Sequence, residues 1–116
     1  MSIYVETLEL MPLGKLSGMS FGTCSGLAKW LKQTETIVFA SLVTIDGPDA
    51  LLLITLVGPL LDDYEMRGIG TIIPEGKGVS YKVAGGTKGA VYEAEFAFTT
   101  STGDVLGFIQ PWHIKS

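Results

Sequence analysis

The chain has 116 residues, a length that is enough for one hydrophobic core. Its residues are 47% apolar and 17% charged, a composition that excludes a disordered chain. Its net charge is −4 and its lysines and arginines are scattered, so the sequence predicts no nucleic-acid partner. It has one cysteine, one histidine and no phosphate-binding loop. It therefore predicts no internal disulfide, no metal site and no cofactor.

Apolar runs in this chain are short. The first residues carry no basic segment followed by a long apolar run, so we expect no signal peptide. The longest apolar run, 50–61, is interrupted by Gly58 and Pro59 and is well below the roughly 20 residues that a membrane-spanning helix needs. The sequence therefore predicts a cytoplasmic protein with a single domain over residues 1–116 and no membrane insertion.

Alternation of apolar and polar residues favours strands along most of the chain. The segment 25–33 fits a short helix through Leu27, Trp30 and Leu31, and it also fits a strand that follows Gly26. We take the strand interpretation there. The clearer strands are expected over 2–10, 15–23, 35–45, 50–57, 63–73, 79–84, 90–100 and 105–114.

Turns rich in glycine and proline separate these segments. The turn at 46–49 leads from the strand 35–45 into 50–57 and predicts a hairpin of the two. Gly58-Pro59 and Gly85-Gly86 interrupt apolar runs in the same way. Closely spaced strands with short turns predict an all-β fold, namely an antiparallel β-barrel of about eight strands with an apolar lumen.

The central strands are apolar on both faces. In 35–45, Ile37, Phe39 and Val43 alternate with Val38 and Leu42. An antiparallel sheet normally turns one face to water, so a second apolar face needs a cover. A partner subunit is the expected cover, since open apolar strands invite aggregation. The sequence therefore predicts a homo-oligomer.

Several glycine-rich motifs resemble the allene oxide cyclase and dirigent family of β-barrels. Gly22 to Leu27 is similar to the Gly-x-x-x-Gly-Leu stretch of the plant cyclases. Val57-Gly58-Pro59-Leu60 with Tyr64-Glu65 resembles their Val-x-Gly-Pro-x-Leu-x-Tyr-Glu block. Val83 to Thr87 resembles the Val-Val-Gly-Gly-Thr of dirigent proteins. The cavity cysteine of the plant cyclases falls on Ala28 here.

The resemblance implies a function. Bacterial barrels of this class include small cyclases, the spirotetronate-type Diels–Alderases, which catalyse intramolecular [4+2] cycloadditions on polyketide chains. The resemblance therefore implies a cofactor-independent cyclase or isomerase in natural-product biosynthesis, with an apolar, polyketide-like or lipid-like small molecule as substrate. Such ring closure needs a shaped apolar cavity more than a nucleophile, because holding the reacting ends together removes much of the barrier.

Candidate site residues follow from this picture. A glutamate buried beside Tyr4 and Leu8 would have a raised pKa and could act as an acid or a base. Large aromatic side chains would form the walls of a cavity, with Trp112 near its mouth. The predicted catalytic residues are Glu6 and Tyr92, and the predicted substrate-binding residues are Trp30, Phe39, Tyr64, Phe96 and Trp112.

Other polar residues have plainer interpretations. Glu93 and Glu95 alternate with aromatic residues and are expected to face solvent, and His113 is expected at the surface. Cys24 is expected to be a small buried hydrophobic residue. Two further functions stay open: a lipocalin-like carrier of a hydrophobic ligand without catalysis, and an assembly module whose outer apolar faces are its functional surface.

Overall fold

A computed structural model describes residues 7–9, 13–16, 19–66 and 71–115 of the chain. Within these residues the protein is all-β, apart from a single turn of 3-10 helix at Ala28–Trp30, as the alternation predicts. Hydrogen bonds join the described strands into three sheets and do not close them into one ring. The all-β class is therefore confirmed, whereas the closed barrel stays a prediction.

The largest sheet is built around the two C-terminal strands. Strand β10 (Val105–Lys115) pairs antiparallel with β9 (Val91–Thr100), and β4 (Ile37–Asp46) pairs antiparallel with the other side of β9. Strands β1 (Thr7–Glu9) and β2 (Leu13–Leu16) lie one after the other along the free edge of β10. Both run parallel to β10, which departs from the all-antiparallel expectation.

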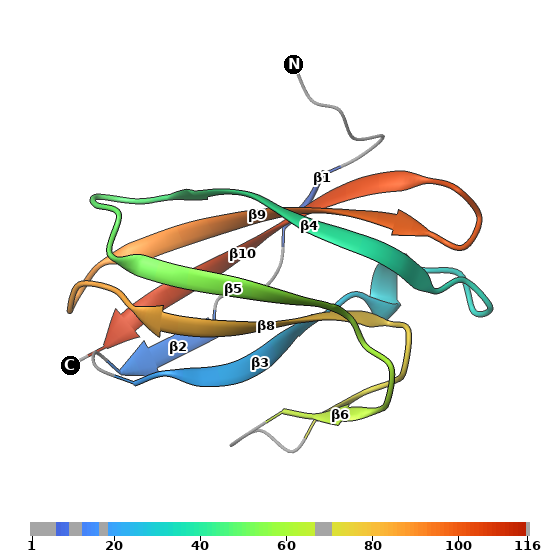
Figure 1. Ribbon diagram of the computed structural model, residues 1–116, viewed down its shortest axis with the longest axis horizontal. Coiled ribbons are helices and arrows are strands. Elements are labelled where there is room, and N and C mark those ends of the chain that lie inside the picture. Colours follow the sequence, from blue (N-terminus) through green and yellow to red (C-terminus); the bar gives the residue numbers. More distant parts are fainter. Residues whose placement is uncertain (1–6, 10–12, 17–18, 67–70, 116) are drawn as a thin grey trace.

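A second sheet faces the first. It has the order β3 (Phe21–Gly26), β8 (Gly78–Gly85), β5 (Leu52–Pro59), and both of its pairings are antiparallel. In Figure 1, β5, β8 and β3 lie in front of β9 and β10, so that the two sheets form two layers. The main core consists of the apolar side chains enclosed between these layers.

Strands β4 and β5 are consecutive but belong to different sheets. The turn at 46–49 joins them, yet no ladder of hydrogen bonds does. The predicted hairpin is therefore wrong, because the turn carries the chain from one layer to the other. Gly47 makes this possible, since a β-carbon there would lie 2.4 Å from Cδ2 of Tyr92.

The strand expected over 25–33 is wrong beyond Gly26. Leu27 is fully buried, and its backbone N–H donates to the carbonyl of Lys77 rather than to a neighbouring strand. The N–H of Trp30 then returns to the carbonyl of Leu27, which closes the 3-10 turn. A buried anchor residue therefore turns the chain where alternation alone suggests that the strand continues.

The expected strand over 63–73 is also different in the structure. Its described parts are β6 (Tyr64–Glu65) and β7 (Ile72–Ile73), which pair antiparallel with each other. This small pair packs over the outer side of β3, where Cys24, Leu60, Met66 and Ile73 form a second buried cluster. Cys24 is fully buried there, as predicted.

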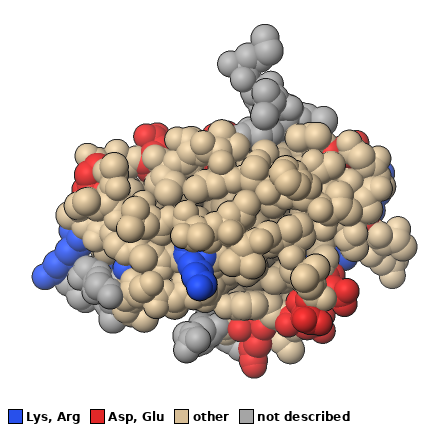
Figure 2. Space-filling view, viewed as in Figure 1, with Lys and Arg blue, Asp and Glu red and all other residues tan. Residues whose placement is uncertain are grey.

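The outer sides of β4 and β5 expose large apolar residues. The side chain of Phe39 is 61% exposed, and Leu53 and Val57 are 60% and 66% exposed. Figure 2 shows the face over these strands, which is nearly free of charged side chains. The prediction that the central strands are apolar on both faces is therefore confirmed.

Candidate functional site

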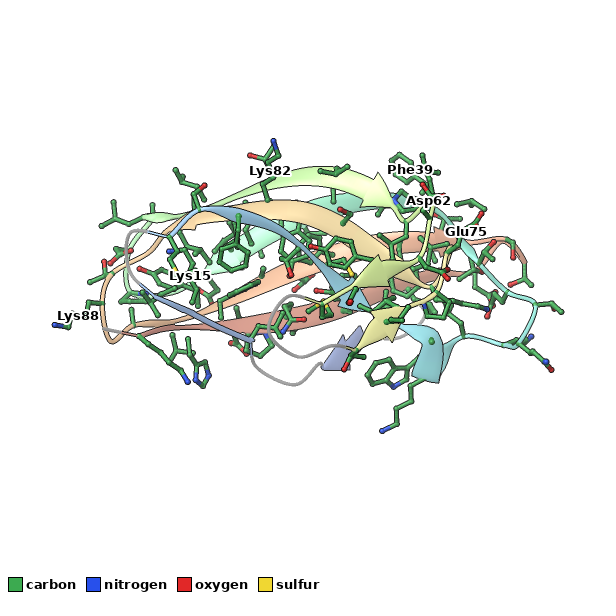
Figure 3. All side chains as sticks on the ribbon, turned by 90° about the horizontal axis from the view of Figure 1, so that it is seen from below. Lys15, Phe39, Asp62, Glu75, Lys82 and Lys88 are labelled. Carbon is green, nitrogen blue, oxygen red and sulfur yellow. The ribbon has the colours of Figure 1, made fainter. Side chains whose placement is uncertain are left out.

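Aromatic rings fill the space between the two sheets. Alternate residues of β8, β9 and β10 point inward, and this places Tyr81, Phe96 and Trp112 in one cluster at 0–1% exposure. The rings of Phe96 and Phe108 stack with centroids 4.8 Å apart, and Tyr81 lies 5.1 Å from Phe96. Figure 3 shows side chains occupying the space between the layers, where the sequence predicts a lumen.

Three buried polar side chains in this apolar interior are joined by hydrogen bonds. The Ser25 hydroxyl donates to Oε1 of Gln110 at 2.9 Å and lies 2.9 Å from the Tyr81 hydroxyl. Since the single hydroxyl proton of Ser25 points to Gln110, Tyr81 donates to Ser25 in this arrangement. These three side chains and that of Trp112 are each no more than 2% exposed, and we call them the interior polar cluster.

The indole N–H of Trp112 is the unusual member of this cluster. It is buried and makes no hydrogen bond within the described structure. The rings of Tyr81 and Trp112 meet edge-on with centroids 6.3 Å apart, and the indole helps to lower the pKa of Tyr81. An unmade hydrogen bond in a dry site costs about 1–3 kcal/mol. Such a donor is therefore ready to satisfy a hydrogen-bond acceptor that enters the interior.

Burial fixes the protonation state of Tyr81. Its enclosure raises the pKa of the phenol above the ordinary value, and the contacts with Ser25 and Trp112 offset this only in part. Tyr81 therefore remains protonated around neutral pH. It acts in this site as a hydrogen-bond donor and not as a base.

The cluster suits electrostatic assistance rather than covalent chemistry. The Trp112 N–H adjoins the Tyr81 hydroxyl, whose proton is donated to Ser25, in a low-dielectric interior where hydrogen bonds to a developing negative charge are strong. Among the described residues, no group of three His, Cys, Asp or Glu side chains could hold a metal ion. The chemistry that this arrangement favours is polarisation of a carbonyl group.

Two of the predicted site residues, Phe96 and Trp112, lie together in this interior. Phe108 stacks on Phe96, and Phe21 meets Trp112 edge-on with centroids 6.1 Å apart. The polar groups near Trp112 come from residues that are not among the predicted site residues. These are Ser25, Tyr81 and Gln110.

Tyr92 is buried but belongs to a different end of the molecule. Its hydroxyl donates to Oδ1 of Asp49 at 2.6 Å and accepts from the backbone N–H of Thr87 at 2.9 Å. The hydroxyl is therefore fully occupied by the turns that flank β5 and β9. Its predicted catalytic role stays a prediction, and the structure gives it a connecting role.

The other predicted residues lie away from the interior polar cluster. Trp30 is 37% exposed on the 3-10 turn, and Phe39 projects from the outer side of β4. The hydroxyl of Tyr64 donates to the carbonyl of Gly22, which attaches β6 to β3. Glu6 lies outside the described residues.

An open depression covers part of the outer side of the larger sheet. Asp46, Glu93, Pro111 and His113 are among its lining residues. Glu93 is exposed and His113 is half-buried there, which agrees with their predicted outward positions. The depression is shallow and open to solvent, so it does not enclose a ligand.

A signal for the missed residues is present in the sequence. Gln110 stands between Phe108 and Trp112 at the same strand parity, so a polar side chain is directed inward among aromatic ones. Buried polar groups need partners, which the sequence alone could not name. The partners come from β3 and β8, more than 25 residues away in the chain.

Comparison of the chain with protein-family models, curated proteins and solved structures gave no match. No helix among the described residues is long and apolar enough to cross a membrane.

Proposed function

We propose that the protein is a cofactor-independent cyclase or isomerase of natural-product biosynthesis that acts on an apolar, polyketide-like or lipid-like molecule carrying a carbonyl group. The observation that carries the proposal is the buried Trp112 N–H, which has no hydrogen-bond partner among the described residues and adjoins the Tyr81 hydroxyl. A carbonyl oxygen at this position would accept a hydrogen bond from the Trp112 N–H, and a second one from Tyr81 once the phenol proton turns from Ser25 to the carbonyl.

In this proposal the two sheets are the flattened walls of a barrel. Around the interior, β10, β9 and β4 are followed by β5, β8 and β3, and the two unbonded seams lie between the sheets. A substrate would occupy the interior after side chains move aside. Phe21 is the natural gate because it is half-buried at the start of β3 and contacts Trp112 edge-on.

The reaction that suits such a site best is an intramolecular [4+2] cycloaddition. Two carbon–carbon σ-bonds form and three π-bonds become one, so the product is an isomer of the substrate. No proton, electron pair or leaving group is transferred to the protein. The site needs to fold the substrate so that its diene meets its alkene, which removes several kcal/mol of barrier.

Tyr81 and Trp112 would add electrostatic help to this folding. Hydrogen bonds to a carbonyl conjugated with the alkene withdraw electron density and activate it toward the diene. The Trp112 N–H is a preorganised donor in a dry interior and acts without reorganisation cost. Since Ser25 and Gln110 hold the Tyr81 hydroxyl, they would be positioning residues rather than catalytic ones.

A carrier function is the second candidate. Most of the other enclosed side chains are apolar, with Val79, Val83 and Phe98 at no more than 1% exposure. An apolar interior favours binding of a hydrophobic ligand whether or not it reacts. In that case the Trp112 N–H would orient a polar end of the ligand without accelerating any step.

The experiment uses the full chain and a linear probe in which a conjugated diene is tethered to an enone. Loss of diene absorbance measures turnover, and mass spectrometry checks that the product has the mass of the probe. We expect ring closure faster than in buffer. Tyr81→Phe and Trp112→Phe should each slow it by roughly ten- to hundred-fold, because each removes one donor. Val91→Ala, on the outer side of β9, is the control and should leave the rate unchanged.

Three outcomes separate the candidates. A loss of rate in Tyr92→Phe alone would place the chemistry at Tyr92 and overturn the role of the interior polar cluster. Binding without turnover, read from Trp112 fluorescence in a Trp30→Phe background, would establish the carrier. Neither binding nor turnover with probes of several chain lengths would overturn both.

A further inference from the structure

Exposed apolar side chains gather on the outer sides of the neighbouring strands β4 and β5. Two bulges in β4, at 37–39 and 42–44, each leave two neighbouring residues exposed. On β5 the alternate residues Leu53 and Val57 are exposed. We call this surface the apolar face. It consists of Val38, Phe39 and Val43 on β4, Leu53 and Val57 on β5, and the flanking Leu51 and Leu61.

The apolar face is large for a protein that stays monomeric. Its seven side chains are between 47% and 82% exposed. That amounts to roughly 800 Å², which exceeds the largest patch of most monomers and matches one partner's share of a standard-size interface. The face therefore has the area that a stable dimer needs.

Charges at the border of the apolar face are distributed unequally. Figure 2 shows one lysine or arginine on this side near the middle of the view, and a group of aspartates and glutamates at the lower edge. Lys82 lies on β8 opposite Thr55 of β5 and is exposed. In Figure 3, Lys82 projects from the same side as Phe39, and Asp62 and Glu75 lie beyond Phe39.

We propose that the apolar face is the interface of a homodimer in which two copies of this chain meet face to face about a two-fold axis. A two-fold interface uses the same surface on both copies, so it must be complementary to itself. The axis would pass between Lys82 and the acidic border. Rotation about it places Lys82 of each copy over Asp62, Asp63 and Glu75 of the other.

The charge pattern favours a second copy over other occupants. An anionic lipid surface would be repelled by the acidic border and by the net charge of −4. No ion pair joins Lys82 to another residue of the described structure, so it is free to meet the acidic border of a second chain. The resulting interface has an apolar centre and a charged rim, which is the usual arrangement.

Light scattering coupled to gel filtration tests this proposal on the full chain at about 10 µM, a concentration at which interfaces of this size associate. We expect a mass of twice the monomer's 12.4 kDa. Val57→Glu should give the monomer mass, because it buries a charge in the interface. Val91→Glu is the matched control, since this valine is also exposed on a strand but lines the depression with Pro111 and His113 and is not part of the apolar face, and it should remain dimeric.

A charge exchange tests the orientation of the two copies. Lys82→Glu should weaken the dimer at least tenfold, because it sets like charges opposite each other. Combining Lys82→Glu with Asp62→Lys and Asp63→Lys should restore association. If the reversal weakens the dimer and the combination fails to restore it, the proposed two-fold arrangement is overturned.

The remaining outcomes overturn the proposal directly. They are a monomer mass for the wild-type chain, a dimer that persists in Val57→Glu, and equal dissociation by Val57→Glu and Val91→Glu. Co-sedimentation of the wild-type monomer with neutral lipid vesicles would instead assign the apolar face to a membrane surface. Circular dichroism of each variant shows that the fold is retained, so a change of mass reports association.

Discussion

The hydroxyl of Tyr92 donates a 2.6 Å hydrogen bond to Oδ1 of Asp49, a residue 43 positions earlier in the chain. Asp49 also accepts from the Thr87 hydroxyl at 2.7 Å and from the backbone N–H of Leu51. These bonds connect the turn between β4 and β5 to the turn between β8 and β9. The two sheets are therefore joined at this end by side chains, where no backbone ladder joins them.

Removing the Tyr92 hydroxyl should loosen this connection. We expect Tyr92→Phe to lower the free energy of unfolding by about 1–2 kcal/mol, because Asp49 and the Thr87 N–H each lose a partner. Tyr64→Phe is the matched comparison, since that hydroxyl bonds a single exposed carbonyl, and it should cost less. Urea unfolding measures both. Equal losses of unfolding free energy would contradict a larger contribution of the Asp49–Tyr92 bond to stability.

Acid should weaken the opposite end of the molecule. The carboxylate of Glu35 accepts hydrogen bonds from the Thr102 hydroxyl and from the backbone N–H of Lys32. These bonds, and the one from Thr102 most of all, lower the pKa of Glu35 to about 2. Because the folded-state pKa is below the unfolded value of 4.5, this stabilisation is complete above pH 4.5. It is lost as the pH falls toward 2.

The variant Glu35→Gln has no carboxylate at this position, so it lacks this stabilisation and its dependence on pH. We therefore expect the stability of the wild type and of Glu35→Gln to differ most above pH 4.5 and to converge as the pH approaches 2. Thermal unfolding across that range measures the difference. Glu93→Gln, on the exposed side of β9, serves as the control. A constant difference between wild type and Glu35→Gln would contradict the assignment of the lowered pKa to this carboxyl.

Sequence reasoning succeeded where the structure depends on local alternation. Tyr92 and Phe96 lie on the strand face opposite Glu93 because of the two-residue period of a strand, and both are buried as expected. The same reasoning could not show that β5 leaves the sheet of β4. The turn at 46–49 has the composition of a hairpin turn, and only packing between the layers determines the sheet to which the next strand belongs.

The candidate site could be anticipated only in part. Phe96 and Trp112 were expected in an apolar interior, because large aromatic residues at inward positions are recognisable from the pattern. Ser25 and Tyr81 were not, because their role depends on meeting Gln110 across the two sheets. Contacts between distant strands follow from topology, which alternation does not specify.

Gly47 should tolerate no larger residue. Its missing side chain leaves room for the buried ring of Tyr92, and a β-carbon there would lie 2.4 Å from Cδ2 of that ring. We expect Gly47→Ala to destabilise the protein by about 1–3 kcal/mol through overpacking. Gly22→Ala is the matched control, since nothing lies within 4 Å of a β-carbon built there, and it should be neutral or slightly stabilising. If both variants unfold at the wild-type urea concentration, the close approach of Gly47 and Tyr92 is not a constraint.

The thiol of Cys24 should be almost inert in the folded protein. It is fully buried beside Met66, with 4.0 Å between the two sulfur atoms, and burial raises its pKa to about 12. The thiolate is the reactive form, so at pH 8 its reaction with a disulfide reagent should be slower than that of an exposed thiol by about three orders of magnitude. Denaturation should restore the ordinary rate. An exposed comparison is Ser20→Cys in a Cys24→Ala background, because Ser20 precedes β3 at the surface. Rapid labelling of Cys24 in the native protein, at a rate close to that of the Ser20→Cys thiol, would mean that the β6–β7 pair opens readily from the outer side of β3.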